Sequence, residues 1–257
     1  MFDPKTLKIK RLSQKYPRII KELEEVFSQP SNVYIDWANV ILAFQPKLKW
    51  KIDIKKLKQF LDSFDTIENS KIYYGTLESD NESEKLIKRF DKLGYQVTTK
   101  PVKIMVSSID ATSIPPDSPA LLKNFIRRPL LTKLDINTIE YLNNRLRELN
   151  EKNIFYLKDK KCNFDVEIGR DMLIDYKNNH IETFILWSGD SDFEEPIKQL
   201  LSDNKKVYIF ATVRRVSREL SSTGAIIFDI QKIKEFICWN KFCSQKDSTE
   251  EPLSFKI

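Results

Sequence analysis

The sequence predicts an α/β fold, a three-layer sandwich in which helices cover both faces of a parallel sheet. Short apolar runs alternate with stretches whose apolar residues recur at helical spacing, which is the pattern of βαβ units. The run at 183–187 is apolar after its first residue, as expected for a strand buried on both faces. With 257 residues and 41% apolar content, the chain can bury one full-sized core and carry a small appendage.

The first part of the chain reads as a leading helix followed by a βαβαβ run. An amphipathic helix begins at Pro17 and ends before Pro30, and the first strand leads directly into Asp36. Gly94 follows the last turn of a later helix. The predicted elements are a helix at 17–27, a strand at 32–35, a helix at 52–64, a strand at 71–76, a helix at 83–93 and a strand at 95–99.

The pattern changes over residues 100–153. This stretch contains a Ser/Pro-rich piece, the basic pair Arg127-Arg128 and a segment of helical spacing at 137–149. A structureless loop of this length is unusual in a compact domain. We therefore predict an inserted subdomain at about 104–152.

The alternation then resumes, with Asn163 as a helix cap. The expected elements are a helix at 164–176, a strand at 183–187, a helix from Asp192 or Phe193 to Leu201, a strand at 206–210, a short helix at 216–221, a strand at 225–228 and a helix at 230–239. We place a helical extension at 1–30, the main domain at 31–243 and a flexible tail at 244–257.

Composition excludes several classes of protein. No run approaches the roughly 18 apolar residues of a membrane span, and the first residues are charged, so we expect no membrane partner and a cytoplasmic location. The cysteines, Cys162, Cys238 and Cys243, are odd in number and lack CxxC spacing, which argues against a disulfide framework and against a zinc site. A single histidine, His180, argues against a His-based zinc site, a Ser-His-Asp triad or a two-histidine ribonuclease. Hydrolytic chemistry would have to use carboxylates.

Acidic residues fall where strands end and helices begin. Asp36 follows the first strand, Asp190 and Asp192 follow the apolar strand at 183–187, and Asp165 lies in the first turn of a predicted helix. The C-terminal ends of parallel strands form the ligand-binding edge of an open sheet. Carboxylates converging there repel one another unless a cation is bound, and hard oxygen ligands favour Mg²⁺ or Mn²⁺. The sequence therefore predicts a metal site made of these four acids.

Each acid also has a structural alternative. Asp36 could cap a helix or belong to a turn, and Asp165 could be an ordinary acid at a helix N-terminus. Asp190 and Asp192 could be turn and cap residues, since Ser-Gly-Asp-Ser-Asp is also common loop chemistry. The metal site is favoured because all four residues fall on the same predicted edge.

Three other polar residues are candidates for supporting roles. Asn39 suits a side-chain amide that orients Asp36 or a metal-bound water, or else a turn residue. Ser188 could contact a phosphate or begin a turn, and Lys161 could balance phosphate charge or belong to a solvated loop. Asp171 lies six residues after Asp165, about 240° around a helix, so we place it outside the metal site, paired with Arg170 or Lys177.

Five segments together resemble a known family. The segments YIDWANV (34–40), KCNFDVEIGRDML (161–173), TFILWSGDSDFEEPIKQL (183–200), KKVYIFATVRRVSREL (205–220) and AIIFDIQKIKEFI (225–237) resemble successive blocks of the NYN domain, in its LabA-like group of the PIN-like nuclease superfamily. The resemblance covers roughly residues 32–236 apart from the insertion. It implies a PIN-like sheet and matches the family's acids to Asp36, Asp165, Asp190 and Asp192, and its Asn to Asn39.

Two features depart from the family pattern. Trp37 stands where members usually carry a small residue, and we expect it to narrow the mouth of the site. The connection after the third strand is about fifty residues long, and we expect it to add a lid, a partner surface or an RNA contact. Neither departure removes an acid.

A basic cluster lies near the same predicted edge. Arg214, Arg215 and Arg218 follow the strand at 206–210, and arginine pairs with phosphate through two parallel hydrogen bonds. The alternative is a solvated helix start. The formal net charge of +6 also favours a polyanionic partner, which we expect to be RNA. Trp37, Tyr73 and Tyr74 could stack on bases, although aromatic strand residues are more often core.

Taken together, these features predict a metal-dependent ribonuclease that hydrolyses single-stranded RNA endonucleolytically. The first alternative is a non-catalytic RNA-binding module on the same fold. The second is a nucleotide-sugar transferase that uses Asp190 and Asp192 as a metal clamp, which leaves Asp36 and Asp165 without a role. RNA against DNA, the target sequence and a homo-oligomeric state stay open.

Overall fold

The computed structural model describes residues 1–41, 51–76, 80–107, 114–151, 157–161, 163–178 and 180–239, and it describes their side chains except at 104–107, 124, 150, 157–161, 178 and 213. The chain forms two compact units. The main unit comprises Met1–Pro101 and Cys162–Ile257, and the second unit comprises Val102–Lys161. The predicted tail at 244–257 and Cys162 lie outside the described residues.

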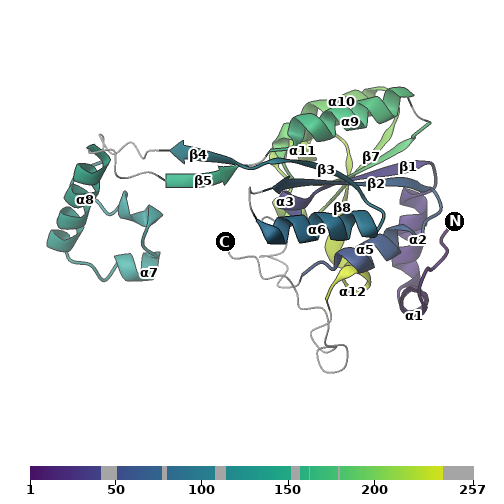
Figure 1. Cartoon of the computed structure of the whole chain (residues 1–257), viewed down its shortest axis with the longest axis horizontal. Helices are drawn as coiled ribbons and strands as arrows, with labels where there is room; N and C mark the ends of the chain where they lie inside the picture. The colour runs from purple at the N-terminus through teal and green to yellow at the C-terminus, as the bar shows by residue number, and fades with distance from the viewer. Residues whose placement is uncertain are drawn as a thin grey trace. The chain divides into compact units, whose positions relative to one another are not determined.

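The main unit is built on a six-stranded sheet in the order β3-β2-β1-β6-β7-β8 (Figure 1). Its strands are β1 (Ser31–Asp36), β2 (Ile67–Thr76), β3 (Gln96–Pro101), β6 (Thr183–Trp187), β7 (Lys206–Ala211) and β8 (Ile226–Asp229). Every pairing is parallel. The chain builds outward from β1 to one edge and then from β6 to the other. The strand order therefore reverses between β1 and β6, and ligands bind at such a switch point in open α/β sheets.

Helices cover both faces of this sheet, and the expected three-layer α/β architecture is confirmed. In Figure 1, α9 and α10 lie on one face, and α2, α5, α6 and α12 lie on the other. The helices of this unit include α1 (Leu7–Lys15), α2 (Pro17–Val26), α3 (Trp37–Asn39), α5 (Ile54–Leu61), α6 (Asn81–Lys92), α9 (Asp165–Asn178), α10 (Glu194–Ser202), α11 (Arg218–Ser221) and α12 (Lys234–Ile237). Short 3-10 turns are η3 (Ser191–Phe193), η4 (Val213–Arg215) and η5 (Ile230–Ile233).

Local sequence explains where several helices begin. Asp53 caps α5 by accepting hydrogen bonds from the backbone N–H groups of Lys55 and Lys56, and Asp80 caps α6 by accepting one from Glu82. Gly94 follows α6 with φ +81°, a left-handed conformation that favours glycine. Asp53 and Asp80 thus satisfy backbone N–H groups that a helix leaves unpaired at its start, whereas Gly94 marks a helix end. Two helices of this unit, α1 and α3, were not predicted: the few apolar side chains of α1 stand among lysines and an arginine, and α3 is only three residues long.

The core lies on both sides of the two central strands. Every residue of β1 and of β6 is buried. Large side chains such as Tyr34, Phe184, Trp187 and Phe210 have almost no exposed surface. Burying one such side chain contributes about 1.5–3 kcal/mol. The strands that lead to Asp36 and to Asp190 and Asp192 are therefore the most completely buried part of the sheet.

The second unit has its own small core. It contains the antiparallel pair β4 (Lys103–Ser107) and β5 (Leu157–Lys161), the turn η2 (Leu122–Asn124) and the helices α7 (Arg128–Leu131) and α8 (Ile136–Glu151). Its buried apolar residues are Leu122, Leu131 and Ile139, with Ile126, Leu134, Leu142 and Leu146 packed against them. The helix expected at 137–149 is present as α8. The β4–β5 pair was missed, because the alternating lysines of β5 resemble a solvated loop.

Within the described residues, no helix is long and apolar enough to cross a membrane. Cys238 is a buried free thiol.

Candidate metal centre

The candidate site begins at the switch point of the sheet. β1 and β6 pair in parallel, with Ile35 opposite Trp187. The next residues along the two strands are Asp36 and Ser188, so the loop that carries Asp190 and Asp192 leaves the sheet beside Asp36. The α9 helix returns the chain from β3 toward the start of β6, which places its first residue, Asp165, at the same edge.

The loop after β6 is ordered by its own polar groups. The Ser188 Oγ accepts a hydrogen bond from the backbone N–H of Asp190 at 3.3 Å. Asp190 is the N-cap of η3, and its Oδ1 accepts from the backbone N–H of Asp192 at 3.4 Å. The turn and cap roles considered for these residues are therefore real. They also fix the directions of the two carboxylates.

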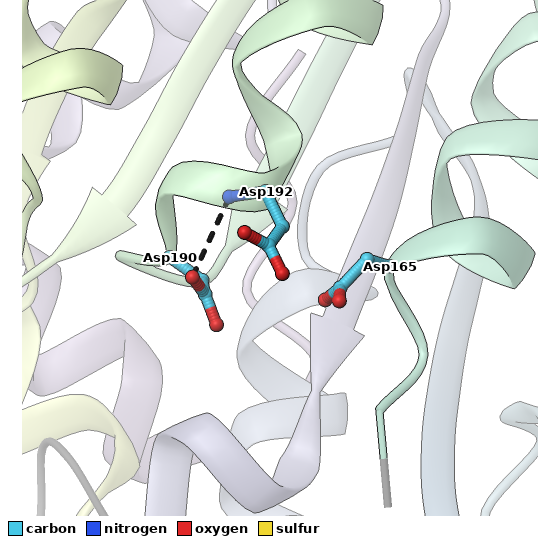
Figure 2. A group of neighbouring side chains, drawn as sticks. All are labelled: Asp165, Asp190 and Asp192. Atoms are coloured by element: carbon cyan, nitrogen blue, oxygen red, sulfur yellow. Dashed lines mark hydrogen bonds between the residues drawn. The ribbon is translucent and has the colours of Figure 1, made fainter.

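Three carboxylates meet in front of this loop (Figure 2). One oxygen from each of Asp165, Asp190 and Asp192 lies within 4.8 Å of the other two. Two ligands of one cation are separated by at most twice the metal–oxygen distance, which is roughly 4–5 Å for Mg²⁺ or Ca²⁺. The three side chains can therefore bind one divalent cation with small adjustments.

The carboxylates of this cluster carry like charges and repel one another. The pKa of Asp165 is raised to about 7, first because the group is desolvated and then by its hydrogen bond to Asp192 and the charges of Asp190, Asp192 and Asp36. Its Oδ1 is buried and has no hydrogen-bond partner among the described groups. A buried carboxylate oxygen that faces other acids is poorly stabilised by the protein alone. The donor set therefore fits a hard divalent cation.

Asp36 adjoins this group. Its side chain is 7% exposed, and its Oδ1 accepts a hydrogen bond from the backbone N–H of Asn39 at 3.1 Å. Burial raises the pKa of Asp36 to about 6, against the effect of the Asn39 N–H and with a contribution from the charge of Asp190. The close cluster contains only the other three acids, so the expected four-acid pocket is brought together in part. Asp36 caps α3, which was its structural alternative.

The three residues predicted to support the site, Asn39, Ser188 and Lys161, differ in burial and in their contacts. The Asn39 Oδ1 is buried and unpartnered among the described groups, and the contact of this residue with Asp36 is made by its backbone N–H. Ser188 is fully buried and is used by the turn, so its hydroxyl offers no surface to a substrate. The side chain of Lys161 lies outside the described residues, while its backbone belongs to β5 and not to a loop.

The basic cluster is exposed at the start of α11 and in η4. Arg214, Arg215 and Arg218 follow β7, and this loop packs directly on the acidic loop. The backbone N–H of Ser217 donates to the Gly189 carbonyl at 2.9 Å, and a Cβ at Gly189 would lie 2.1 Å from the Arg215 carbonyl oxygen. Only glycine allows this approach.

Sequence reasoning did not identify the role of Gly189. The one available signal is a glycine between an apolar strand and two acids. It also missed Lys100, whose Nζ donates to both carboxylate oxygens of Glu167 at 2.8 Å and lies 4.8 Å from the Phe164 ring centroid. This cation is held against the first turn of α9. The contact joins β3 to α9 and cannot be inferred from local sequence.

The structure also tests the predictions for Asp171, Tyr73 and Trp37, through their contacts and their burial. Asp171 pairs with Arg170 at 2.8 Å, as expected, and accepts a hydrogen bond from the Tyr73 hydroxyl at 2.9 Å. Tyr73 and Trp37 are core residues. The expectation that Trp37 narrows the mouth of the site is wrong, because its ring is buried with its centroid 5.4 Å from that of Phe90.

The fold and the acidic edge define a three-layer α/β protein with a candidate metal centre at the switch point of its sheet. Residues 124–229 match the NYN domain model, and the NYN domain belongs to the PIN-like nuclease superfamily. The prediction of an NYN domain is confirmed. The matched residues include Asp165, Asp190, Asp192 and the three arginines, while Asp36 and Asn39 precede them. Assignment to the LabA-like group stays a prediction.

A crystal structure of a protein of unknown function from Vibrio parahaemolyticus is similar with a TM-score of 0.49 and 16% sequence identity, covering 80% of this chain and 94% of that chain. A search of curated proteins gave no match.

Proposed function

We propose that the protein is a metal-dependent ribonuclease. The observation that carries this proposal is the meeting of Asp165, Asp190 and Asp192 within 4.8 Å at the switch point of an NYN-domain sheet. The NYN domain is a nuclease-like fold, and the acidic cluster suits a divalent metal. Mg²⁺ or Mn²⁺ is the proposed ion, because all the available ligands are carboxylates.

In this proposal each residue has a separate task. Asp165, Asp190 and Asp192 hold the cation, and Asp36 lies beside them where it can orient a water or hold a proton. The bound cation supplies Lewis-acid stabilisation of the phosphate and lowers the pKa of a bound water. Asn39 fixes Asp36 through its backbone N–H, at 3.1 Å from the Asp36 Oδ1. Arg214, Arg215 and Arg218 grip the RNA backbone by pairing with phosphates.

The products follow from the nucleophile. Water attack on the phosphorus leaves a 5′-phosphate and a 3′-hydroxyl, whereas attack by the RNA 2′-hydroxyl gives a cyclic phosphate. Activation of a 2′-hydroxyl requires a general base, commonly histidine. The only histidine of the chain, His180, is exposed and lies 2.5 Å from Glu68, at the opposite end of α9 from Asp165. Water attack is the proposed route, because a cation held by the three acids would lower the pKa of a bound water.

The alternatives are less well supported. In a nucleotide-sugar transferase, Asp190 and Asp192 alone would clamp a diphosphate, yet Asp165 completes their cluster. A non-catalytic RNA-binding module has no need for three acids that oppose phosphate binding. The cytoplasmic location and the homo-oligomeric state stay predictions.

The direct test incubates the purified chain with labelled single-stranded RNA and DNA in Mn²⁺, Mg²⁺ or EDTA. We expect cleavage of RNA with Mn²⁺ or Mg²⁺, none with EDTA, and 5′-phosphate product ends. A circular RNA substrate separates endonucleolytic from exonucleolytic cleavage, and we expect it to be cut. Absence of cleavage across all metals and substrates favours the binding module instead.

A further inference from the structure

The second unit carries a short segment in which only positive charges occur. Residues 123–133 contain Lys123, Arg127, Arg128 and Lys133 and no acidic residue. All four side chains are exposed. Within the described part of the chain, none of them forms an ion pair with an acid. We call residues 123–133 the basic segment.

Exposed apolar side chains stand among these charges. Phe125 is 40% exposed and Leu130 is 56% exposed, and both lie between the basic residues. Exposed cations alternating with an aromatic ring form the combination that binds single-stranded nucleic acid, since the cations track phosphates and the ring stacks on a base. An ordinary solvated surface carries charges of both signs.

The basic segment is a fixed surface. Leu122, Leu131 and Ile126 point into the core of the second unit. The Ile126 N–H donates to the Leu122 carbonyl at 2.8 Å, and the Leu130 N–H donates to the Arg127 carbonyl at 2.8 Å. The charged side chains are thus presented from a backbone held by its own hydrogen bonds. Binding to such a surface costs less ordering entropy than binding to a loose loop.

The neighbouring α8 helix shows the contrast. Its Arg145 pairs with Glu148 at 2.8 Å, and its Arg147 donates to the Ile114 carbonyl. These cations are used within the unit, whereas the four cations of the basic segment are available to a partner.

We propose that the basic segment binds single-stranded RNA and does so independently of the metal centre. The choice of RNA as the polyanion rests on the proposed function. Lys123, Arg127, Arg128 and Lys133 contact phosphates, and Phe125 stacks on a base. The protein then has two sites that contact RNA, the metal centre, which cleaves the RNA, and the basic segment, which binds it.

The test measures RNA binding by the full chain in EDTA, where cleavage is blocked. The fluorescence anisotropy of a short labelled oligouridylate is followed over a range of KCl concentrations for the parent, for Arg127→Ser with Arg128→Ser, and for Arg11→Ser with Arg18→Ser. The last pair removes the same charge from the exposed surfaces of α1 and α2. Circular dichroism melting checks that each variant is folded.

For single strands the slope of log affinity against log salt decreases in magnitude by about 0.7 for each phosphate that the protein no longer neutralises. We expect a decrease of roughly this amount per arginine in the Arg127→Ser/Arg128→Ser variant and an unchanged slope in the control variant. We expect Phe125→Ala to weaken binding about tenfold without changing the slope, while Tyr141→Ala on α8 has no effect.

An unchanged slope in the Arg127→Ser/Arg128→Ser variant overturns the proposal. A stronger dependence of anionic-vesicle binding than of RNA binding on these arginines also overturns it, because the surface would then serve a membrane. The same samples assayed with Mn²⁺ separate this outcome from failure of the proposed function. Cleavage by the parent together with unaltered binding by the variant sinks only the inference about the basic segment.

Discussion

The two ends of α9 each carry an aspartate in a shielded setting, and the two settings are opposite. Asp175 is 5% exposed and accepts hydrogen bonds from Asn32 at 2.7 Å, Tyr34 at 2.5 Å and Lys71 at 2.7 Å. Asp165 faces Asp190 and Asp192 and has a buried oxygen without a partner among the described groups. A buried acid with donors around it holds a structure together, while one surrounded by acids requires a ligand. The comparison distinguishes a carboxylate that the fold itself uses from one that we propose as a metal ligand, both on a single helix.

The largest expected effect is on cleavage. Asp190→Asn keeps the size of the side chain and its ability to accept from the Asp192 N–H, but it removes one negative charge from the metal ligands. We expect metal-dependent cleavage of RNA to fall at least about 100-fold. RNA binding in EDTA should be kept or become tighter, because a charge that repels phosphate is removed. Equal cleavage by parent and variant would remove Asp190 from the mechanism.

Gly189 offers the next largest effect. A methyl group at this position would overlap the Arg215 carbonyl oxygen at 2.1 Å, so Gly189→Ala must push the arginine loop away from the acids. We expect cleavage to fall at least about tenfold, with a lower melting temperature. Gly169→Ala is the matched control, since its new Cβ would lie 3.5 Å from Pro196, an ordinary contact. It should leave cleavage unchanged and stabilise α9 by roughly 0.5–1 kcal/mol. Similar activities for the two variants would contradict the assigned role of Gly189.

The two aspartates of α9 should respond oppositely in stability. Asp175→Ala leaves Lys71, Tyr34 and Asn32 without their shared acceptor and should lower the free energy of unfolding by roughly 3 kcal/mol. Asp165→Asn removes repulsion and should raise the melting temperature of the protein in EDTA. Chemical denaturation of both variants provides the check. A loss of stability in Asp165→Asn would show that this carboxylate is structural too.

A smaller effect is expected on the pH dependence of stability. Asp165 and Asp36 have pKa values raised to about 7 and about 6, so the native state binds more protons than the unfolded chain between about pH 4 and 7. Their contribution to stability in EDTA therefore falls as pH rises through this window. A divalent cation offsets the repulsion only where the acids are ionised. The rise in melting temperature caused by Mn²⁺ should be larger near pH 8 than near pH 5, and calorimetry that finds the reverse would argue against these ligands.

Sequence reasoning predicted the succession of strands along the chain and the three acids of the close cluster, because both are local signals. Apolar runs mark strands, and Asp165, Asp190 and Asp192 stand at predicted helix starts and strand ends. It did not predict the Asp175 network, the Lys100–Glu167 pair or the approach of Gly189 to Arg215. These depend on segments distant in sequence that only the folded sheet brings together. Trp37 was misplaced for the same reason, since its packing partner Phe90 lies on a later helix.

The pairing of Lys103 with Lys161 affects the loop-closure entropy of the chain segment that forms the second unit. The first and last strands of this unit, β4 and β5, pair with each other. The two chain ends that join this unit to the rest of the protein are therefore close together, whatever the length of chain between them. Loop-closure entropy grows by only about 0.6 kcal/mol for each doubling of a flexible loop, and a folded ribbon whose ends meet avoids even that. We therefore expect a change in chain length beyond the ribbon to alter the folding equilibrium of the sheet only slightly. The β4–β5 ribbon is thus a point at which the chain could gain, exchange or lose a surface without disturbing the acids.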